Sequence, residues 1–206
     1  MRSRRWVYLL VFSLVFLTLQ ACGPRVQPEE SCQFVQNSNG QRVSWKGDLP
    51  VKLYIHESVP VQYREAVASA LGRWDEALGS RSIFQLAGVI NQGTEPVQDR
   101  VSVIYWRDRW DGQKAGEQAR TTVFWKGNQI LEADVQINAQ DFNFSTGAHA
   151  LSGAVDIESL FVHEFGHVLG LAHSAIEGSV MATRLASGVL RRSPSKTDLD
   201  SLRCEY

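Results

Sequence analysis

The sequence predicts an α/β domain in which helices pack against a single mixed sheet. Two observations support this prediction. Short stretches of alternating or β-branched apolar residues, typical of strands, recur between residues 51 and 138. Stretches with apolar residues at three- and four-residue spacing, typical of amphipathic helices, lie among and after them. The resulting order of strand, helix, four strands, helix, loop and helix is that of an α/β sandwich.

The first half of the domain has clear local signals. Residues 51–55 alternate apolar and polar side chains, which predicts a half-buried strand. Residues 63–78 repeat apolar side chains at helical spacing, and Gly79 is a plausible stop. Further strands are expected at residues 82–86 and 101–106.

The second half begins with two strands, 121–125 and 130–138, joined by a tight turn at 126–128. In the second of these strands polar residues alternate with apolar ones, so we expect one face to be exposed. Residues 141–150 are predicted to form a loop. Asp156 and Ser195 are good N-caps, and each precedes a predicted helix, the first extending to Leu169.

Composition excludes several classes of protein. A chain of 206 residues with 44% hydrophobic and 21% charged residues is typical of one globular domain with a short extra segment. The formal net charge of −1 gives no indication of a polyanionic partner such as nucleic acid.

The N-terminus predicts export. Three arginines among the first five residues precede an apolar run over residues 6–19, which is typical of a secretory signal and short for a bilayer-spanning anchor, the alternative. Residues 19–22, Leu-Gln-Ala-Cys, resemble the lipobox of bacterial lipoproteins. We therefore expect a signal peptide over residues 1–21, lipidation of Cys22 and membrane anchoring through that lipid. Gly23 after the cysteine favours the outer membrane, if the cell has one, with the domain facing the periplasm or the surface.

The mature chain is then divided in two. Residues 22–44 are rich in polar residues and Pro, with little to bury, and are predicted to form a tether. Residues 45–206 are predicted to form the folded domain. Removal of the signal leaves 18 basic and 22 acidic residues, a net charge of 18 − 22 = −4.

The helix after Asp156 contains the candidate metal ligands. His163 and His167 are four residues apart, so both imidazoles lie on one face of the helix. His173 can reach the same ion only if the chain turns back, which Gly170 allows because glycine tolerates the left-handed conformation that ends helices. Three neutral imidazoles leave one position of a tetrahedral zinc to water, as in catalytic sites.

Glu164 lies next to the first ligand and is the candidate general base. A carboxylate there can take a proton from a water that zinc activates and pass it to the leaving amine. A chance pair of histidines is the alternative, but the complete pattern with Gly170 and His173 is far more specific.

Residues 163–174, HEFGHVLGLAHS, closely resemble the zinc signature of the matrixins, a branch of the metzincins. Met181 stands at the position of the Met-turn that forms the floor of the zinc site in that clan. The resemblance implies a zincin fold with a mostly parallel five-stranded sheet and three helices. It also implies zinc endopeptidase activity on proteins or peptides, with substrate bound along an edge strand over residues 121–126.

Some features depart from the family pattern. Ala182 and Thr183 stand where matrixins usually place Tyr and Pro after the Met, so the resemblance does not predict the wall of the specificity pocket. Only His56 and His149 lie upstream of the signature, so a second, structural zinc is not expected. Calcium is a further candidate cofactor, with Asp134, Asp141 and Asp156 as candidate ligands, although acidic loop residues are more often simply solvated.

Two questions stay open at this level. Cys32 and Cys204 are expected to form a disulfide in an oxidising compartment; the alternative is a free Cys32 acting as an inhibitory metal ligand. A peptidase of another metzincin branch, or a zinc-binding envelope lipoprotein without turnover, would share most of these residues.

Overall fold

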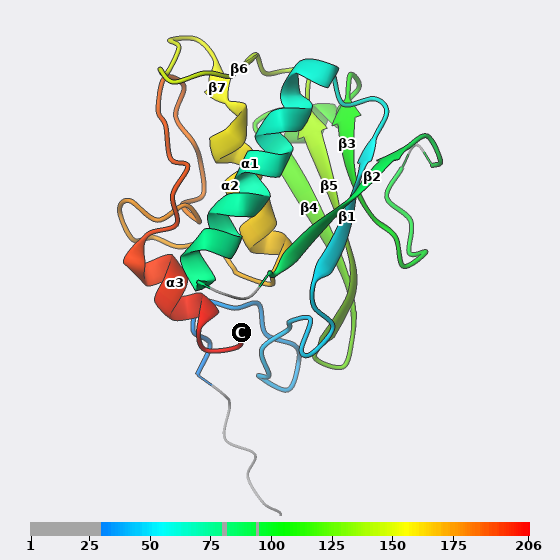
Figure 1. The fold of residues 1–206 in the computed structure, drawn as a ribbon, viewed down its shortest axis with the longest axis vertical. Helices are drawn as coiled ribbons and strands as arrows, with labels where there is room; N and C mark the ends of the chain where they lie inside the picture. Colours follow the sequence, from blue (N-terminus) through cyan, green and yellow to red (C-terminus); the bar gives the residue numbers. More distant parts are fainter. Residues whose placement is uncertain (1–29, 80–81, 94) are drawn as a thin grey trace, which may run out of the picture.

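A computed structural model describes residues 30–79, 82–93 and 95–206, and in this part of the chain the predicted α/β architecture is confirmed (Figure 1). Five strands form one mixed sheet, and three α-helices accompany it. In chain order the elements are β1 (Val51–His56), α1 (Val61–Leu78), β2 (Phe84–Ile90), β3 (Ser102–Arg107), the 3-10 turn η1 (Gly112–Lys114), β4 (Ala119–Lys126), β5 (Gln129–Asn138), β6 (Phe144–Ser145), β7 (Val155–Asp156), α2 (Ile157–Val168) and α3 (Lys196–Leu202).

The main sheet has the order β2-β1-β3-β5-β4, and its pairs are parallel except for β4, which runs antiparallel to β5. A two-residue turn, Gly127–Asn128, joins β4 to β5, as the tight-turn prediction required. Since β4 lies at one edge of this sheet, one side of it pairs with no other strand of the sheet. The predicted loop at 141–150 contains the short strand β6, which pairs with β7.

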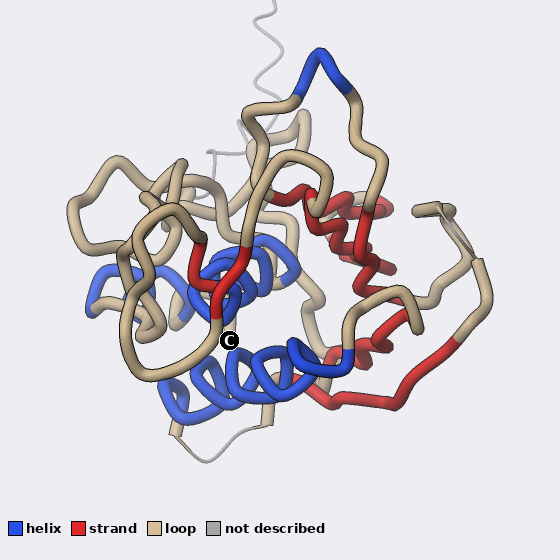
Figure 2. Tube along the Cα trace, turned by 90° about the horizontal axis from the view of Figure 1, so that it is seen from above, coloured by secondary structure: helices blue, strands red, loops and turns tan. Residues whose placement is uncertain are grey.

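Helices α1 and α2 pack against each other beside the sheet, and the view from above separates them from its strands (Figure 2). Trp74 of α1 is fully buried at this contact and donates its indole N–H to the Val162 carbonyl at 3.0 Å. Phe161 and Phe165 of α2 are also fully buried. The core therefore packs α2 against α1 and the sheet, and α2 is the helix that contains His163 and His167.

Both predicted N-caps lie at the starts of their helices. The Asp156 carboxylate accepts the Ser159 N–H at 2.9 Å at the start of α2, and Arg192 pairs with it. Although burial acts to raise it, hydrogen bonds from Arg192 and Ser159 hold the pKa of Asp156 below its ordinary value. At the start of α3, Ser195 and Asp198 form a capping box.

The prediction of an exposed polar face on β5 is wrong. Glu132, Asp134, Gln136 and Asn138 are all at most 9% exposed. Loop segments cover this face: Glu132 accepts the Arg100 N–H, and Asn138 donates to the Glu117 carbonyl at 2.9 Å. Strand periodicity distinguishes the two faces of a strand, but it does not say whether a loop covers the polar one.

The first described residues belong to the domain rather than to a tether. Phe34 and Val43, both inside the segment 22–44 predicted as a tether, are buried in the core at 3% and 1% exposure. Cys32 and Cys204 form a disulfide with a Cα–Cα distance of 6.4 Å, so the segment is covalently joined to the end of α3. The free Cys32 of the alternative hypothesis is not found.

The predicted signal peptide, residues 1–21, and the predicted lipidation site Cys22 lie outside the described residues. Over the part of the chain that is described, no helix combines the length and apolar character needed to cross a membrane.

The buried Asp134 makes stability depend on pH. Burial raises its pKa from 3.8 to about 7, so the folded protein holds this carboxyl protonated up to a pH at which the unfolded chain has lost the proton. Stability is therefore expected to fall as pH rises from about 4 through about 7, by at most about 4 kcal/mol.

Asp134→Asn should remove this part of the decline, because an amide does not titrate. The amide keeps an oxygen that can accept the Val103 N–H, which lies 2.9 Å from Asp134 Oδ1 in the wild type. Urea unfolding at pH 5 and pH 8 measures the effect, with the exposed Asp108→Asn as control. Equal pH slopes for wild type and Asp134→Asn would contradict this account of the carboxyl.

Candidate metal centre

The three histidines of the motif come together at the end of α2. His163 and His167 lie one turn apart on the helix, and the chain reverses at Gly170, which has a φ of +97°. The Leu171 N–H reaches back to the Gly166 carbonyl at 2.9 Å and closes the helix end. A Cβ at Gly170 would lie 2.3 Å from the Val43 carbonyl oxygen, so both conformation and space require glycine here.

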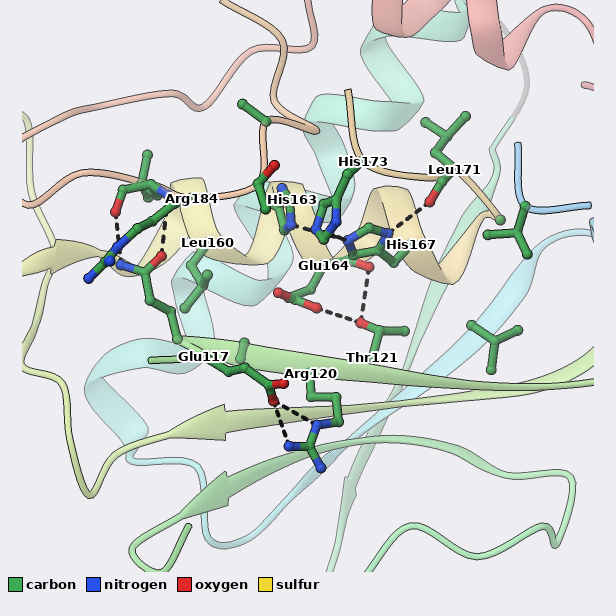
Figure 3. A pocket seen from close by; sticks show the side chains of 18 of the residues that line it. Glu117, Arg120, Thr121, Leu160, His163, Glu164, His167, Leu171, His173 and Arg184 are labelled. Carbon is green, nitrogen blue, oxygen red and sulfur yellow. Dashed lines mark hydrogen bonds and ion pairs between the residues drawn. The ribbon is translucent and has the colours of Figure 1, made fainter. Parts of the chain in front are cut away.

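The imidazole nitrogens converge on one point. His167 Nε2 lies 3.1 Å from His163 Nε2 and 3.2 Å from His173 Nε2 (Figure 3). Two nitrogens bound at 2.0–2.1 Å to a tetrahedral zinc are about 3.3 Å apart, so the observed spacing fits that ion. Within the described ranges this is the one group of three or more His, Cys, Asp or Glu residues whose ligand atoms close on a common centre.

The surrounding main chain orients two of the three rings. His163 Nδ1 donates to the Val180 carbonyl at 2.7 Å, and His167 Nδ1 donates to the Leu171 carbonyl at 2.8 Å. These bonds place the hydrogen on Nδ1 and leave the Nε2 lone pairs directed inward. Burial lowers the pKa of His163 and of His167 to about 4, which keeps both rings neutral, as metal ligands must be.

Glu164 lies beside the histidines and faces the sheet. It is 4% exposed, and the Thr121 hydroxyl on β4 donates to its Oε2 at 2.7 Å. Burial raises the pKa of Glu164 above its ordinary value, while the neighbouring His167 and the Thr121 hydrogen bond act in the opposite direction. Its carboxylate is thus held in one orientation next to the point where the imidazoles meet.

Met181 forms the floor beneath this group. It is 1% exposed, and a Cβ at Gly166 would lie 2.2 Å from its sulfur, so the side chain packs directly on the helix between the two ligands. The buried Asp198 of α3 holds the floor, accepting the Ser179 hydroxyl at 2.5 Å and the Val180 N–H at 3.0 Å. Because Val180 also accepts from His163, α3 is coupled to a candidate ligand.

A cavity of about 570 Å³ opens over the histidines, between β4 and α2. Ala182, Thr183 and Leu185 line it, so the stretch after Met181 that departs from the family pattern forms part of the cavity wall. Gln118 fixes this wall by donating to the Leu185 carbonyl at 2.8 Å and accepting the Leu185 N–H at 3.3 Å.

Sequence reasoning did not identify Gln118, Thr121 or Asp198 as parts of the site. Each acts on a residue at least 18 positions away in the chain, so no local spacing signals the contact. For Thr121 the available signal was the predicted strand over residues 121–125, which is part of the expected substrate edge.

The candidate calcium ligands have other partners. Asp156 is paired with Arg192 and Ser159, and Asp134 accepts the Val103 N–H. Asp141 accepts the side-chain N–H of Asn138 at 3.0 Å. In the described ranges none of these three carboxylates belongs to a group of three or more His, Cys, Asp or Glu side chains whose ligand atoms lie within 4.8 Å of one another.

Comparison with known proteins adds independent information. A family model described as Matrixin matches residues 51–203. Metalloendoproteinase 4-MMP of Arabidopsis thaliana is 28% identical over 152 residues, which cover 68% of this chain and 41% of that protein. Metalloendoproteinase 2-MMP of the same plant is 37% identical over 57 residues, 28% of this chain and 15% of that protein. The chain thus spans less than half the length of these curated relatives.

The turn at Gly170 allows a direct test of how the third histidine is placed. Gly170→Ala adds a methyl group that meets the Val43 carbonyl and also strains a positive φ. Gly147→Ala is a matched control, because Gly147 has a φ of +111° and nothing within 4 Å of the added carbon.

Gly147→Ala should lower the free energy of unfolding by about 1–2 kcal/mol from backbone strain alone. Gly170→Ala should lower the free energy of unfolding by about 1–3 kcal/mol more, because the added methyl group overpacks the site. It should also weaken zinc binding, because His173 is displaced. Chemical unfolding and zinc titration measure the two effects. Equal costs with unchanged zinc affinity would show that the close approach to Val43 does not place His173.

Proposed function

Since this chain belongs to the matrixin family, we propose that it is a zinc-dependent endopeptidase that hydrolyses internal peptide bonds of proteins. The convergence of three Nε2 atoms beside a buried glutamate carries the proposal. His163, His167 and His173 would hold the ion, and Glu164 would act as general base. The four side chains lie at the bottom of a cavity that is open to a substrate.

Zinc bound by the three imidazoles would supply a Lewis acid that polarises the scissile carbonyl and lowers the pKa of water to about 7. Glu164 would accept a proton from the attacking water at its carboxylate and deliver that proton to the nitrogen of the leaving amine. Thr121, whose hydroxyl donates to Glu164 Oε2 at 2.7 Å, would hold the carboxylate in the orientation needed for both transfers. The base is therefore positioned before substrate arrives.

Substrate would bind as an additional strand along the free edge of β4. Main-chain N–H and C=O groups on that edge can pair with an extended peptide without regard to its sequence. The same strand contains Thr121, so main-chain pairing would place a peptide bond close to Glu164. Proximity of this kind accounts for much of an enzyme's rate enhancement.

The decisive experiment compares wild type with Glu164→Gln on a library of unrelated peptides read by mass spectrometry. Wild type with one zinc per chain should cleave internal bonds, and removal of zinc by a chelator should abolish cleavage. Glu164→Gln should retain zinc and lose activity by a factor of about 10² or more, the usual share of general base catalysis. The glutamine keeps an oxygen for the Thr121 hydroxyl, so it serves as the conservative replacement.

Wild-type activity in Glu164→Gln would refute the role of Glu164. Stoichiometric zinc with no cleavage of any peptide by wild type would instead favour the non-catalytic alternative, a zinc-binding envelope protein.

We propose further that the mature protein is an exported lipoprotein tethered to a membrane through Cys22. The proposal rests on the basic start, the apolar run and the Leu-Gln-Ala-Cys sequence at residues 19–22. The Cys32–Cys204 disulfide supports it, since such bonds persist in oxidising compartments outside the cytosol.

Cys22→Ser should therefore shift the protein from the detergent-soluble membrane fraction to the aqueous fraction when it is expressed in a bacterium that processes lipoproteins. Wild type expressed with labelled fatty acid should carry the label. An unlabelled wild type that partitions like Cys22→Ser would rule out the lipid anchor.

A further inference from the structure

The residues that follow Cys32 form a hairpin that closes one end of the cavity. The Val43 N–H donates to the Val35 carbonyl at 2.8 Å, and the Asn37 N–H donates to the Gln41 carbonyl at 2.9 Å. We call residues 35–43 the N-terminal hairpin. Its two valines line the same cavity as the histidines.

Two sets of main-chain bonds fix the N-terminal hairpin in place. On one side the Val35 N–H donates to the Gly170 carbonyl at 2.9 Å, at the turn that ends α2. On the other side Ser44, directly after the hairpin, donates its N–H to the Asn128 carbonyl at 3.1 Å, in the turn between β4 and β5. The hairpin therefore bridges from the catalytic helix to the far end of the candidate substrate strand, and Figure 3 shows this blue segment beyond Leu171.

Strand β4 presents apolar side chains to the same end of the cavity. Thr121, Val123 and Trp125 all line it, and Thr121 is the residue that contacts Glu164. A strand advances about 3.3 Å per residue, so Val123 and Trp125 lie roughly 7 and 13 Å along β4 from Thr121. Trp125 is 45% exposed and Val35 is 38% exposed, which is high for large apolar residues that line one cavity.

The two ends of the cavity differ in charge. The lining residues contributed by the hairpin, by the turn after α2 and by the end of β4 are all uncharged: Val35, Val43, Gly170, Leu171, Val123 and Trp125. Glu117 and Arg184 also line the cavity, and Figure 3 shows them on the other side of the histidines from Leu171. A polar side chain of a bound peptide would lose hydration at the hairpin end without gaining a partner, while an apolar one would cover Val35 and Trp125.

We propose that Val35, Val123 and Trp125 form an apolar subsite that selects the substrate side chain two to four residues from the scissile bond, on one side of that bond only. The inference rests on the proposed peptidase function, because the occupant is the extended peptide that lies along β4. The spacing of Val123 and Trp125 from Thr121 sets the distance from the cut, since an extended peptide advances at the same rise per residue. The N-terminal hairpin is thereby a specificity element and not only a closing segment.

The test is a peptide-library digest with wild type and Val35→Asp, read by mass spectrometry. Wild type should enrich apolar side chains at one position two to four residues from the cut. Val35→Asp should lose that enrichment, with kcat/KM for a matched Leu-containing peptide falling about 10-fold or more relative to its Asp-containing twin. Preferences on the other side of the cut should not change.

Val61→Asp is the control, because Val61 is an exposed valine at the start of α1 and does not line the cavity. Thermal unfolding and zinc content should match wild type for both variants. If Val35→Asp keeps the wild-type preference, or shifts preferences equally on both sides of the cut, the subsite does not exist.

A binding experiment separates this inference from the proposed function. In the Glu164→Gln background, the affinity for the Leu-containing peptide should fall about 10-fold when Val35→Asp is added, as measured by calorimetry. Loss of affinity without any wild-type cleavage would support the subsite and refute the peptidase. Equal affinity with and without Val35→Asp would overturn the subsite whether or not wild type cleaves.

Discussion

The main constraint on this molecule is the convergence of three imidazole nitrogens, with His163 Nε2 and His173 Nε2 each about 3 Å from His167 Nε2. Because the rings of His163 and His167 carry their hydrogen on Nδ1, their Nε2 lone pairs face each other and repel unless a cation lies between them, so the fold has to hold these two rings together. It does so by binding the outer nitrogens of His163 and His167 to main-chain carbonyls. Much of the remaining structure serves to place those two carbonyls.

The two carbonyls depend on parts of the chain that are distant in sequence. Val180 belongs to the loop over Met181, and that loop is anchored by the buried carboxylate of Asp198 on α3. Leu171 lies in the turn after α2, where Phe34 pairs with it and Gln33 accepts the Ala172 N–H at 2.6 Å. The ends of the described chain thus converge on the supports of the candidate metal centre.

The sequence predicted those parts of the structure that have a local signature. Asp156 as an N-cap, the one-turn spacing of His163 and His167 and the glycine turn at Gly170 depend on residues within a few positions of each other. The contact between Thr121 and Glu164 could not be foreseen in the same way, because it joins an edge strand to a helix 43 residues later.

The segment before residue 45 illustrates a different kind of limit. Its composition is that of a linker, yet Phe34 and Val43 are buried in the core and the disulfide joins the segment to the domain. Composition averages over a segment, whereas packing depends on a few residues. The buried acidic face of β5 reflects a related limit, since only the path of the covering loop determines whether a carboxylate such as Asp134 meets water.

The bond between Cys32 and Cys204 also determines how mechanical load enters the domain. A force applied to the chain before Cys32 is transmitted through the disulfide to the segment after α3 as well as along the main chain. Without the disulfide, the same force would act on residues 33–44 alone and could break their hydrogen bonds one after another. Reduction of that bond would leave non-covalent contacts, such as the ion pairs of Glu205 with Arg42 and Lys46, to resist the same force. The disulfide thus divides between two attachment points any force that a tether before Cys32 would apply to the domain.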